Sequence, residues 1–166
     1  MAMALFLSTV AFGQSKPPAS PADSTAGTVA GSSIKITYSS PSVRGRKIWS
    51  GLVPYDKVWR TGANAATQFE TSKDIKINNK TLHAGKYSLF TIPGEKEWKI
   101  IFNSATGIPG IKEDGSTTDD PSKDVLVVSA TPVKSDAMNE RFKIKIDAKG
   151  FTLLWENLAV PVNIHK

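Results

Sequence analysis

The sequence predicts an all-β domain, a single antiparallel β-sandwich of jelly-roll type with about eight strands and little helix. Three observations predict this class. Short segments alternate apolar with polar residues, turn-forming residues stand between them, and no segment keeps a helical period for more than about two turns. Strict alternation places one face of a strand on the core and the other in water, which is typical of antiparallel sheets. Short strands separated by turns at this spacing favour two packed sheets.

The strands can be followed in chain order. We expect them over residues 34–38, 75–77, 86–92, 97–103, 125–128, 140–147, 151–156 and 158–164. Segments 34–38, 75–77 and 97–103 alternate isoleucine and aromatic residues with Lys, Thr, Asp or Glu, so each has one dry face. Segment 86–92 is rich in aromatic and β-branched residues, which predicts a central strand.

The C-terminal strands differ from one another in pattern. Segment 125–128 is continuously apolar, which predicts a strand covered on both faces. Segment 140–147 shows the clearest alternation, with apolar side chains on one side and charges on the other. Pro161 has no N–H for a ladder hydrogen bond, so the last strand is expected to lie at an edge or to bend there. The single place where a short helix is expected is 55–59.

Turn residues occupy the gaps between the strands. Asn78-Asn79 tolerates the left-handed conformation of a tight hairpin, 93–96 joins two strands, and Gly150 ends the turn at 148–150. Residues 103–123 form a long polar connection, and a loop of that length is either functional or mobile. Its acidic residues do not have the spacing of a calcium loop, so we predict a solvated loop and no metal site.

The N-terminal residues predict export. Residues 1–13 are apolar and uncharged and end in Ala11-Phe12-Gly13, a small-x-small pattern, so we interpret them as a signal peptide cleaved before Gln14. The positive start of such signals is missing, consistent with an N-terminally truncated signal; an apolar strand or short helix is the alternative. Residues 14–31 are rich in Pro, Ser and Ala and predict a disordered linker. Residues 32–166 are then the folded domain, and no segment approaches the roughly 20 apolar residues of a membrane span.

Composition narrows the classes of function. The chain has no cysteine, which excludes disulfides, thiol catalysis and zinc–thiolate sites. An exported chain without disulfides fits a periplasmic or extracellular location in bacteria. The net charge of +6 is spread along alternating strands without a basic run. We therefore expect a solvated face and no nucleic-acid binding, with weak attraction to anionic ligands.

Four motifs together resemble a known family. They are Tyr38-Ser-Ser-Pro-Ser-Val-Arg-Gly-Arg-Lys-Ile-Trp49, Gly51-Leu-Val-Pro-Tyr55, Val58-Trp-Arg-Thr-Gly-Ala-Asn64 and Ala84-Gly-Lys-Tyr-Ser-Leu-Phe-Thr-Ile-Pro-Gly94. The chain is similar through them to domain-of-unknown-function family 2911, a group of exported bacterial all-β proteins. The resemblance is close over 34–102 and looser to 154–157, and it departs at 107–111, where the family carries aromatic residues. It implies fold and export, and no activity.

Catalytic constellations are weak in this sequence. The chain has two histidines, His83 at a hairpin end and His165 near the C-terminus, and neither has a carboxylate at a sequence spacing that indicates a catalytic pair. No Gly-x-Ser-x-Gly nucleophile elbow occurs. Glu70 and Glu156 lie on or near strands and are expected to face outward. We therefore assign no catalytic residue and no cofactor. The enzymatic alternative is a hydrolase-like activity on a glycan or ester, using Glu70 or another carboxylate with His83.

A ligand-binding constellation is the stronger hypothesis. Arginine binds carboxylate or phosphate bidentately, and indole and phenol rings offer flat faces to a polar ligand. The candidate residues, all between the predicted strands, are Arg44, Arg46, Trp49, Tyr55, Trp59, Arg60 and Asn64. The structural alternative places the tryptophans in the core and uses the arginines and the asparagine to tie down turns.

These patterns favour a non-enzymatic exported domain that binds a ligand or serves the cell envelope. The ligand would be small and polar or anionic, or it would be a segment of another envelope protein. A hydrolase, a purely structural secreted domain and partner recruitment by strand addition are the alternatives. Arginines that converge on one cavity would favour binding, and a carboxylate beside His83 in a pocket would favour catalysis.

Overall fold

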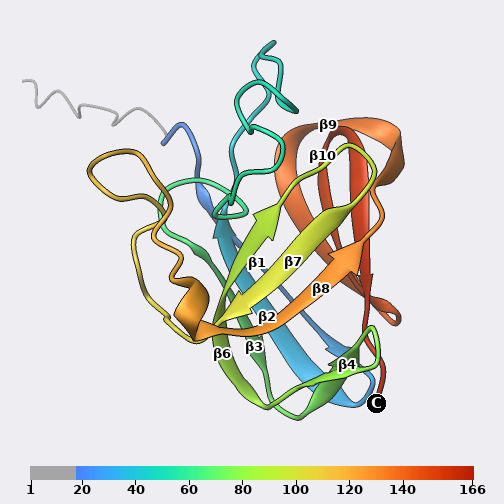
Figure 1. The fold of residues 1–166 in the computed structure, drawn as a ribbon. Coiled ribbons are helices and arrows are strands. Elements are labelled where there is room, and N and C mark those ends of the chain that lie inside the picture. The colour runs from blue at the N-terminus through green and yellow to red at the C-terminus, as the bar shows by residue number, and fades with distance from the viewer. Residues whose placement is uncertain (1–17) are drawn as a thin grey trace, which may run out of the picture.

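The computed structural model describes residues 18–166 and shows an antiparallel two-layer β fold (Figure 1). The large sheet contains, in spatial order, β1 (Ala22–Val29), β2 (Ser32–Ser39), β3 (Thr67–Thr71), β6 (Gly85–Ile92), β7 (Trp98–Asn103) and β8 (Asp124–Ala130). The second layer is the long hairpin of β9 (Val133–Asp147) and β10 (Gly150–Asn163), and a small hairpin pairs β4 (Ile75–Ile77) with β5 (Lys80–Leu82). The all-β antiparallel prediction is confirmed.

Neighbouring strands of the large sheet are mostly consecutive in the chain. Only the β4–β5 hairpin interrupts the series, between β3 and β6. The sheet is therefore a meander, which differs from the crossed connections of a jelly roll. The described residues form ten strands, because β1, β3 and β5 add to those expected, while 151–156 and 158–164 merge into β10.

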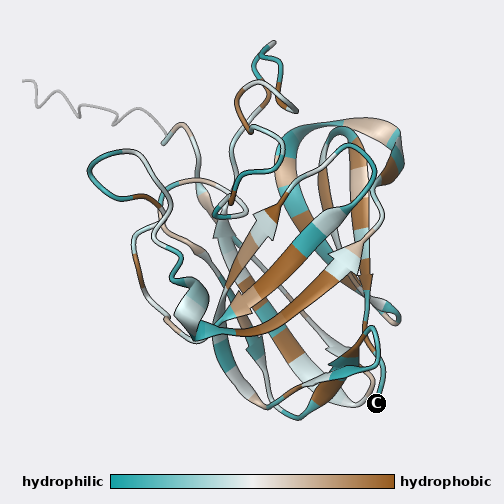
Figure 2. Cartoon of the chain, viewed as in Figure 1, coloured by the Kyte–Doolittle hydropathy of each residue, from teal (hydrophilic) through white to brown (hydrophobic). Residues whose placement is uncertain are grey.

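The core lies between the two layers. Alternation decides which side chains enter it: along β2, Ile34, Ile36 and Tyr38 are buried, and the residues between them face water. The β9–β10 hairpin covers them with Phe142 and Phe151, among others. Figure 2 shows this as alternating brown and teal along the strands. Contacts between β1 and β9, and between β10 and β8, close the layers on both sides into a flattened barrel.

Strand β1 corrects the expected extent of the N-terminal linker. Residues 14–31 were predicted to be disordered, yet Ala22–Val29 pairs with β2 along its whole length. A two-residue turn joins β1 to β2. Its residues Ala30 (φ 52°) and Gly31 (φ 81°) both adopt the left-handed conformation that such a hairpin requires. The strand is polar because it lies at the edge of the sheet, with one face in water. Residues 1–13, predicted to be a signal peptide, lie outside the described part of the chain.

Two further elements differ from expectation. Segment 125–128 is not covered on both faces, because Val125 and Val127 are 50% and 37% exposed while the residues between and after them are buried. No helix forms over 55–59; within residues 18–166 the helical segment is the 3₁₀ turn η1 (Pro121–Lys123), and no helix there is long and apolar enough to span a membrane. Pro161 lies beyond Ala159, the last β10 residue in register with β9, as a residue without an N–H requires.

Both edges of the large sheet are covered. At β8, Asn78 Nδ2 donates to the carbonyl of Ser129 at 2.7 Å, and Lys80 Nζ donates to the carbonyl of Val127 at 3.3 Å. These side chains come from the β4–β5 hairpin, whose tip residues Asn78 and Asn79 have the positive φ predicted for them. At the other edge, β1 lies beside β9. Side chains therefore occupy two carbonyls of the β8 edge, and β9 lies alongside the β1 edge without joining its sheet.

Tyr38 joins the two layers through its hydroxyl. The group donates to Asp23 Oδ2 at 3.0 Å and accepts the backbone N–H of Ile144 at 3.1 Å, while its ring packs edge-on against Phe142. The hydroxyl therefore crosses from β2 to β9. Burial, the largest cause, raises the pKa of Tyr38 to about 12.

This raised pKa predicts an alkaline loss of stability. The unfolded chain ionises its tyrosines near pH 10, whereas folded Tyr38 keeps its proton until about pH 12. The contribution of Tyr38 is therefore complete below pH 10 and is lost as the pH rises toward 12. Urea unfolding from pH 8 to 12 should show this fall, and the fall should be shallower in Tyr38→Phe. An equally steep fall in the variant would contradict the assignment.

Candidate functional site

All four tryptophans meet in one aromatic cluster at one end of the sandwich. Trp49 and Trp59 come from the connection between β2 and β3, Trp98 begins β7, and Trp155 lies in β10. The ring centroids of Trp49 and Trp98 are 5.1 Å apart, and the rings of Trp59 and Trp155 are stacked at 5.9 Å. Edge-to-face and offset arrangements of this kind add to the stability gained from burial. The cluster forms the floor on which the candidate site is built.

Two adjacent hollows open above this floor. The polar hollow, of about 320 Å³, is lined by Ser20, Pro41, Arg46, Leu52, Val53, Trp59, Arg60, Gly62, Ala63, Asn64 and Trp155. The apolar hollow, of about 390 Å³, is lined by Leu52, Val53, Pro54, Lys57, Val58, Trp59, Arg60, Ile111, Gly115, Ser116 and Thr117. Leu52, Val53, Trp59 and Arg60 line both. Each volume is in the range of about 300–1,000 Å³ that is typical of small-molecule sites.

Arg60 is the unusual side chain of these hollows. It is half-buried, and its Nε is fully buried without a hydrogen-bond partner. Residues 18–166 form two ion pairs, His83–Asp74 and Lys86–Glu70, and Arg60 takes part in neither. Burial lowers the pKa of its guanidinium, which is the mark of a charge without a compensating anion. The terminal nitrogens of this guanidinium are not among the buried atoms, so they are free to pair with an anion from the hollows.

Gly110 gives the Arg60 side chain its space. A Cβ at position 110 would lie 2.0 Å from Arg60 Cδ and 2.3 Å from the carbonyl oxygen of Asn64. The N–H of Gly110 donates to that same oxygen at 3.2 Å. The long 104–120 loop therefore packs directly on the segment that carries Arg60. It makes up most of the 103–123 connection, for which the length predicts a functional or mobile loop, and it walls the apolar hollow with Ile111 and residues 115–117.

The backbone after Arg60 is held in a sparsely populated conformation. Thr61 has φ 58°, a genuine outlier for a β-branched residue, and Asn64 has φ 59°. The Thr61 hydroxyl bonds to Thr91 Oγ1 at 3.1 Å, and its carbonyl accepts from Thr67 Oγ1 at 2.6 Å. These bonds anchor the turn to the strands β3 and β6. Residues held in this way cluster at ligand sites more often than elsewhere.

The predicted site residues divide into two groups. Arg46, Trp59, Arg60 and Asn64 line the polar hollow. Arg44, Trp49 and Tyr55 line neither hollow. Two of the three arginines thus converge on one cavity.

Their hydrogen bonds explain the division. Arg46 donates to the carbonyl of Ser42 at 2.6 Å and to that of Val43 at 3.1 Å, so it lines the hollow and also fixes its loop. Arg44 is exposed and donates to the carbonyl of Ala19 at 3.3 Å. Arg44 and Arg46 therefore tie down turns, as the structural alternative predicts, and Arg60 does not.

Several lining residues escaped the sequence analysis. Trp155 and Ile111 come from β10 and the 104–120 loop, far along the chain from Arg60. Leu52 and Val53 lie inside the second motif, but their apolar side chains carried no chemical signal. The motif around 154–157 did mark Trp155, although nothing in the sequence placed it beside Trp59.

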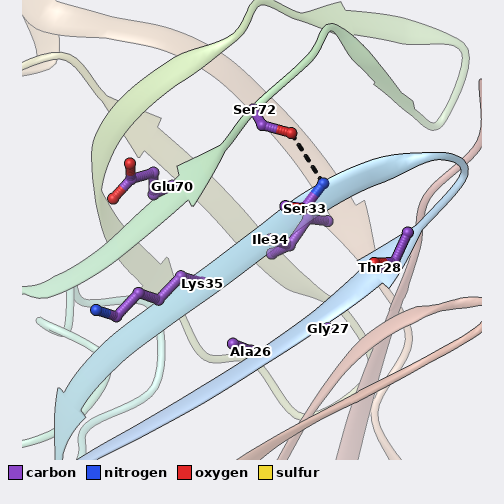
Figure 3. A pocket seen from close by; sticks show the side chains of 8 residues that line it. All are labelled: Ala26, Gly27, Thr28, Ser33, Ile34, Lys35, Glu70 and Ser72. Carbon is purple, nitrogen blue, oxygen red and sulfur yellow. Dashed lines mark hydrogen bonds between the residues drawn. The ribbon is translucent and has the colours of Figure 1, made fainter.

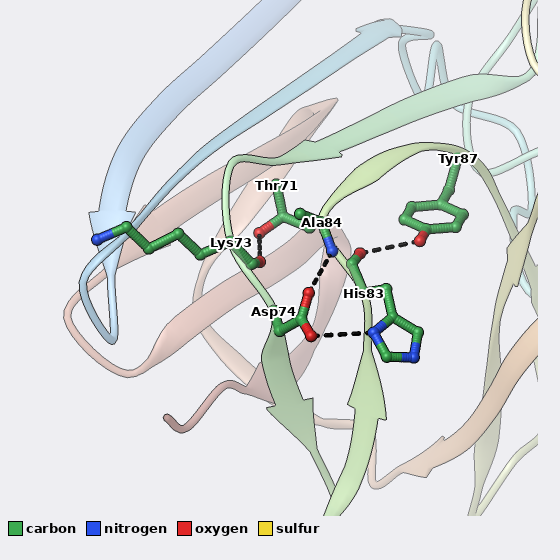
Figure 4. Close-up of polar contacts among 6 residues, drawn as sticks. All are labelled: Thr71, Lys73, Asp74, His83, Ala84 and Tyr87. Atoms are coloured by element: carbon green, nitrogen blue, oxygen red, sulfur yellow. Dashed lines mark hydrogen bonds and ion pairs between the residues drawn. The ribbon is translucent and has the colours of Figure 1, made fainter.

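His83 has a carboxylate partner, but the pair is outside the hollows. His83 Nδ1 and Asp74 Oδ2 are 2.9 Å apart, and the N–H of Ala84 donates to Asp74 Oδ1 at 2.8 Å (Figure 4). That backbone bond and the bond to His83 lower the pKa of Asp74. Both side chains are mostly exposed, and neither lines the hollows described above. Glu70, the carboxylate first considered, pairs with Lys86 at 3.2 Å.

A third hollow lies on the outer surface of β1–β3 (Figure 3). It is lined by Ala26, Gly27, Thr28, Ser33, Ile34, Lys35, Glu70 and Ser72. Two of its polar side chains already have partners, since Ser72 Oγ accepts from the N–H of Ser33 at 2.9 Å and Glu70 is paired with Lys86. Most of these residues are exposed on the open face of a sheet. The hollows around Arg60 are therefore the better candidate site.

Comparison with known proteins gives one match. The family model described as "Protein of unknown function (DUF2911)" matches residues 20–164. No curated protein and no solved structure matches the chain. Among residues 18–166, no three His, Asp or Glu side chains come together in a way that could hold a metal ion.

Proposed function

Because this chain belongs to the DUF2911 family of proteins of unknown function, we propose a function from its geometry. The protein is an exported, non-enzymatic binding domain that takes a small anionic ligand in the hollows around Arg60. The carrying observation is the Arg60 side chain on the wall shared by both hollows, which has neither a hydrogen-bond partner nor an ion pair among residues 18–166. A carboxylate or phosphate would supply both.

The other groups around Arg60 support an anion. The indole N–H of Trp155, which lines the polar hollow, is also buried without a partner. Asn64 donates from Nδ2 at the rim, to Ser20 and Ser39. The lining of the two hollows contains the cations Arg46, Lys57 and Arg60 and no carboxylate, which suits an anionic ligand.

The lining argues against the hydrolase alternative. No Asp, Glu or His lines either of the two hollows. Acid–base catalysis needs such a group within hydrogen-bond reach of the substrate. The exposed Asp74–His83 pair lines neither of these hollows. We therefore favour binding over catalysis.

A thermal-shift screen of the full chain tests this proposal. A ligand at 100 times its Kd stabilises the folded state by about 2.7 kcal/mol, which raises Tm by roughly 5–10 °C in a chain of this size. We expect such shifts with carboxylates or phosphates and none with neutral analogues of equal size. Sodium chloride at matched ionic strength is the control for screening. Equal shifts with charged and neutral compounds, or none at all, would reject the anion site.

Export is the part of the proposal that rests on residues 1–13. Their apolar, uncharged run and the Ala11-Phe12-Gly13 pattern are typical of a secretory signal. N-terminal sequencing of the protein purified from a bacterial periplasm or medium should begin at Gln14. Full-length protein found in the cytoplasm alone would contradict export.

A further inference from the structure

We infer that the ligand is an amphipathic carboxylate, with its carboxylate on Arg60 and an apolar chain in the apolar hollow. This inference rests on the proposed anion site and adds the chemical class of the ligand. It depends on the contrast between two hollows that share one wall. A ligand that binds Arg60 can extend to either side of it.

The two hollows offer different chemistry to such a ligand. On one side of Arg60 stand Arg46, Asn64 and Ser20, which are polar. The other side is lined mainly by Val58, Pro54, Ile111 and the shared Leu52, which are apolar. A purely polar ion would leave this apolar wall in water. A purely apolar molecule would leave the guanidinium without a partner, at the cost of a buried unpaired charge.

Leu52 and Ile111 mark the apolar side as a contact surface. Leu52 is 47% exposed and Ile111 is 44% exposed, and both line the same hollow. They approach it from different segments, Leu52 from the β2–β3 connection and Ile111 from the 104–120 loop. Large apolar side chains exposed at the mouth of a pocket indicate that the ligand covers them with an apolar group.

The charge of the site selects a carboxylate. Arg60 presents one guanidinium without a partner, while Arg46 already donates to two backbone carbonyls. A single planar guanidinium matches a single carboxylate through two parallel hydrogen bonds. A phosphate with nearly two charges would call for a second cation with free donors, whereas Arg46 is held on carbonyls and Lys57 is exposed on the apolar side.

Calorimetric titration of the full chain with butyrate, hexanoate and octanoate, below micelle formation, tests this. We expect the Kd to tighten roughly fourfold per added methylene that is buried. 1-Octanol, the neutral molecule of equal chain length, should bind at least about tenfold more weakly than octanoate, because it cannot form the charged pair. Inorganic phosphate is the second comparison and should bind more weakly than octanoate.

Two double variants of the protein test where the alkyl chain of octanoate binds. Leu52→Ser with Ile111→Ser should bring the affinity for octanoate down to that for butyrate. Val125→Ser with Val127→Ser removes two similarly exposed apolar side chains from β8, outside both hollows, and should change nothing. All four side chains are substantially exposed, so neither variant should unfold the protein.

The outcomes separate this inference from the anion site. If butyrate, octanoate and phosphate bind with equal affinity, the amphipathic ligand is rejected and the anion site stands. If no carboxylate and no phosphate binds, both fail. An octanoate affinity that falls in the Val125/Val127 variant, or persists in the Leu52/Ile111 variant, would show binding elsewhere on the surface and would overturn the inference.

Discussion

Replacing Trp98 with alanine should lower the free energy of unfolding by about 3–5 kcal/mol, the cost typical of deleting a large buried aromatic side chain. Trp98 is 1% exposed and contacts the rings of Trp49 and Trp59 at centroid distances of 5.1 and 6.2 Å. Its removal leaves a cavity in the aromatic cluster, against the rings of Trp49 and Trp59. Urea unfolding followed by far-UV circular dichroism measures the loss.

Trp98→Phe is the matched control. The indole N–H of Trp98 is buried without a partner, so phenylalanine loses no hydrogen bond and keeps most of the ring. We expect less than half of the loss seen with alanine. If Trp98→Ala cost less than about 1 kcal/mol, the cluster would not be the support of this end of the domain.

Replacing Arg60 with methionine should weaken the binding of the best carboxylate about 10- to 100-fold, because hydrogen bonds to a charged group contribute about 1.5–3 kcal/mol. The same change should leave Tm unchanged or raise it. Methionine keeps an unbranched apolar stem against Gly110 and removes a partly buried charge that no side chain of residues 18–166 pairs with. Binding sites often sacrifice stability in this way.

Arg44→Met is the control for this substitution. It removes an arginine from the same loop region, but Arg44 is exposed and lines neither hollow. We expect it to bind carboxylate like the parent chain. A large drop in Tm for Arg60→Met with unchanged affinity would assign Arg60 a structural role and would end the ligand-binding proposal.

The strands were predictable where the pattern is local. Alternation over 34–38 or 140–147 depends only on neighbouring residues, so it predicts β2 and the end of β9 correctly. Strand β1 was missed because its residues are polar and small, and its stability comes from pairing with β2. Segment 125–128 shows the converse error, since an apolar run cannot reveal which of its side chains face water.

The site was predictable only in part, for the same reason. Arg46, Trp59, Arg60 and Asn64 lie within one stretch of chain, and their residue types pointed to anion binding. Trp155 reaches the polar hollow through the pairing of β10, which no local pattern reveals. The sequence also could not show which arginine side chains have hydrogen-bond partners. Whether a guanidinium bonds a carbonyl, as Arg46 does, or stays unpaired depends on the folded loop.

The hairpin that lies against β8 also affects how copies of the protein behave together. Fibrils grow when a row of unpaired amides and carbonyls accepts strands from further molecules. In residues 18–166 the carbonyls of Val127 and Ser129 already accept from Lys80 and Asn78, and the opposite margin lies beside β9. These contacts therefore oppose the edge-to-edge addition of a further strand, whether it comes from another copy or from a partner protein.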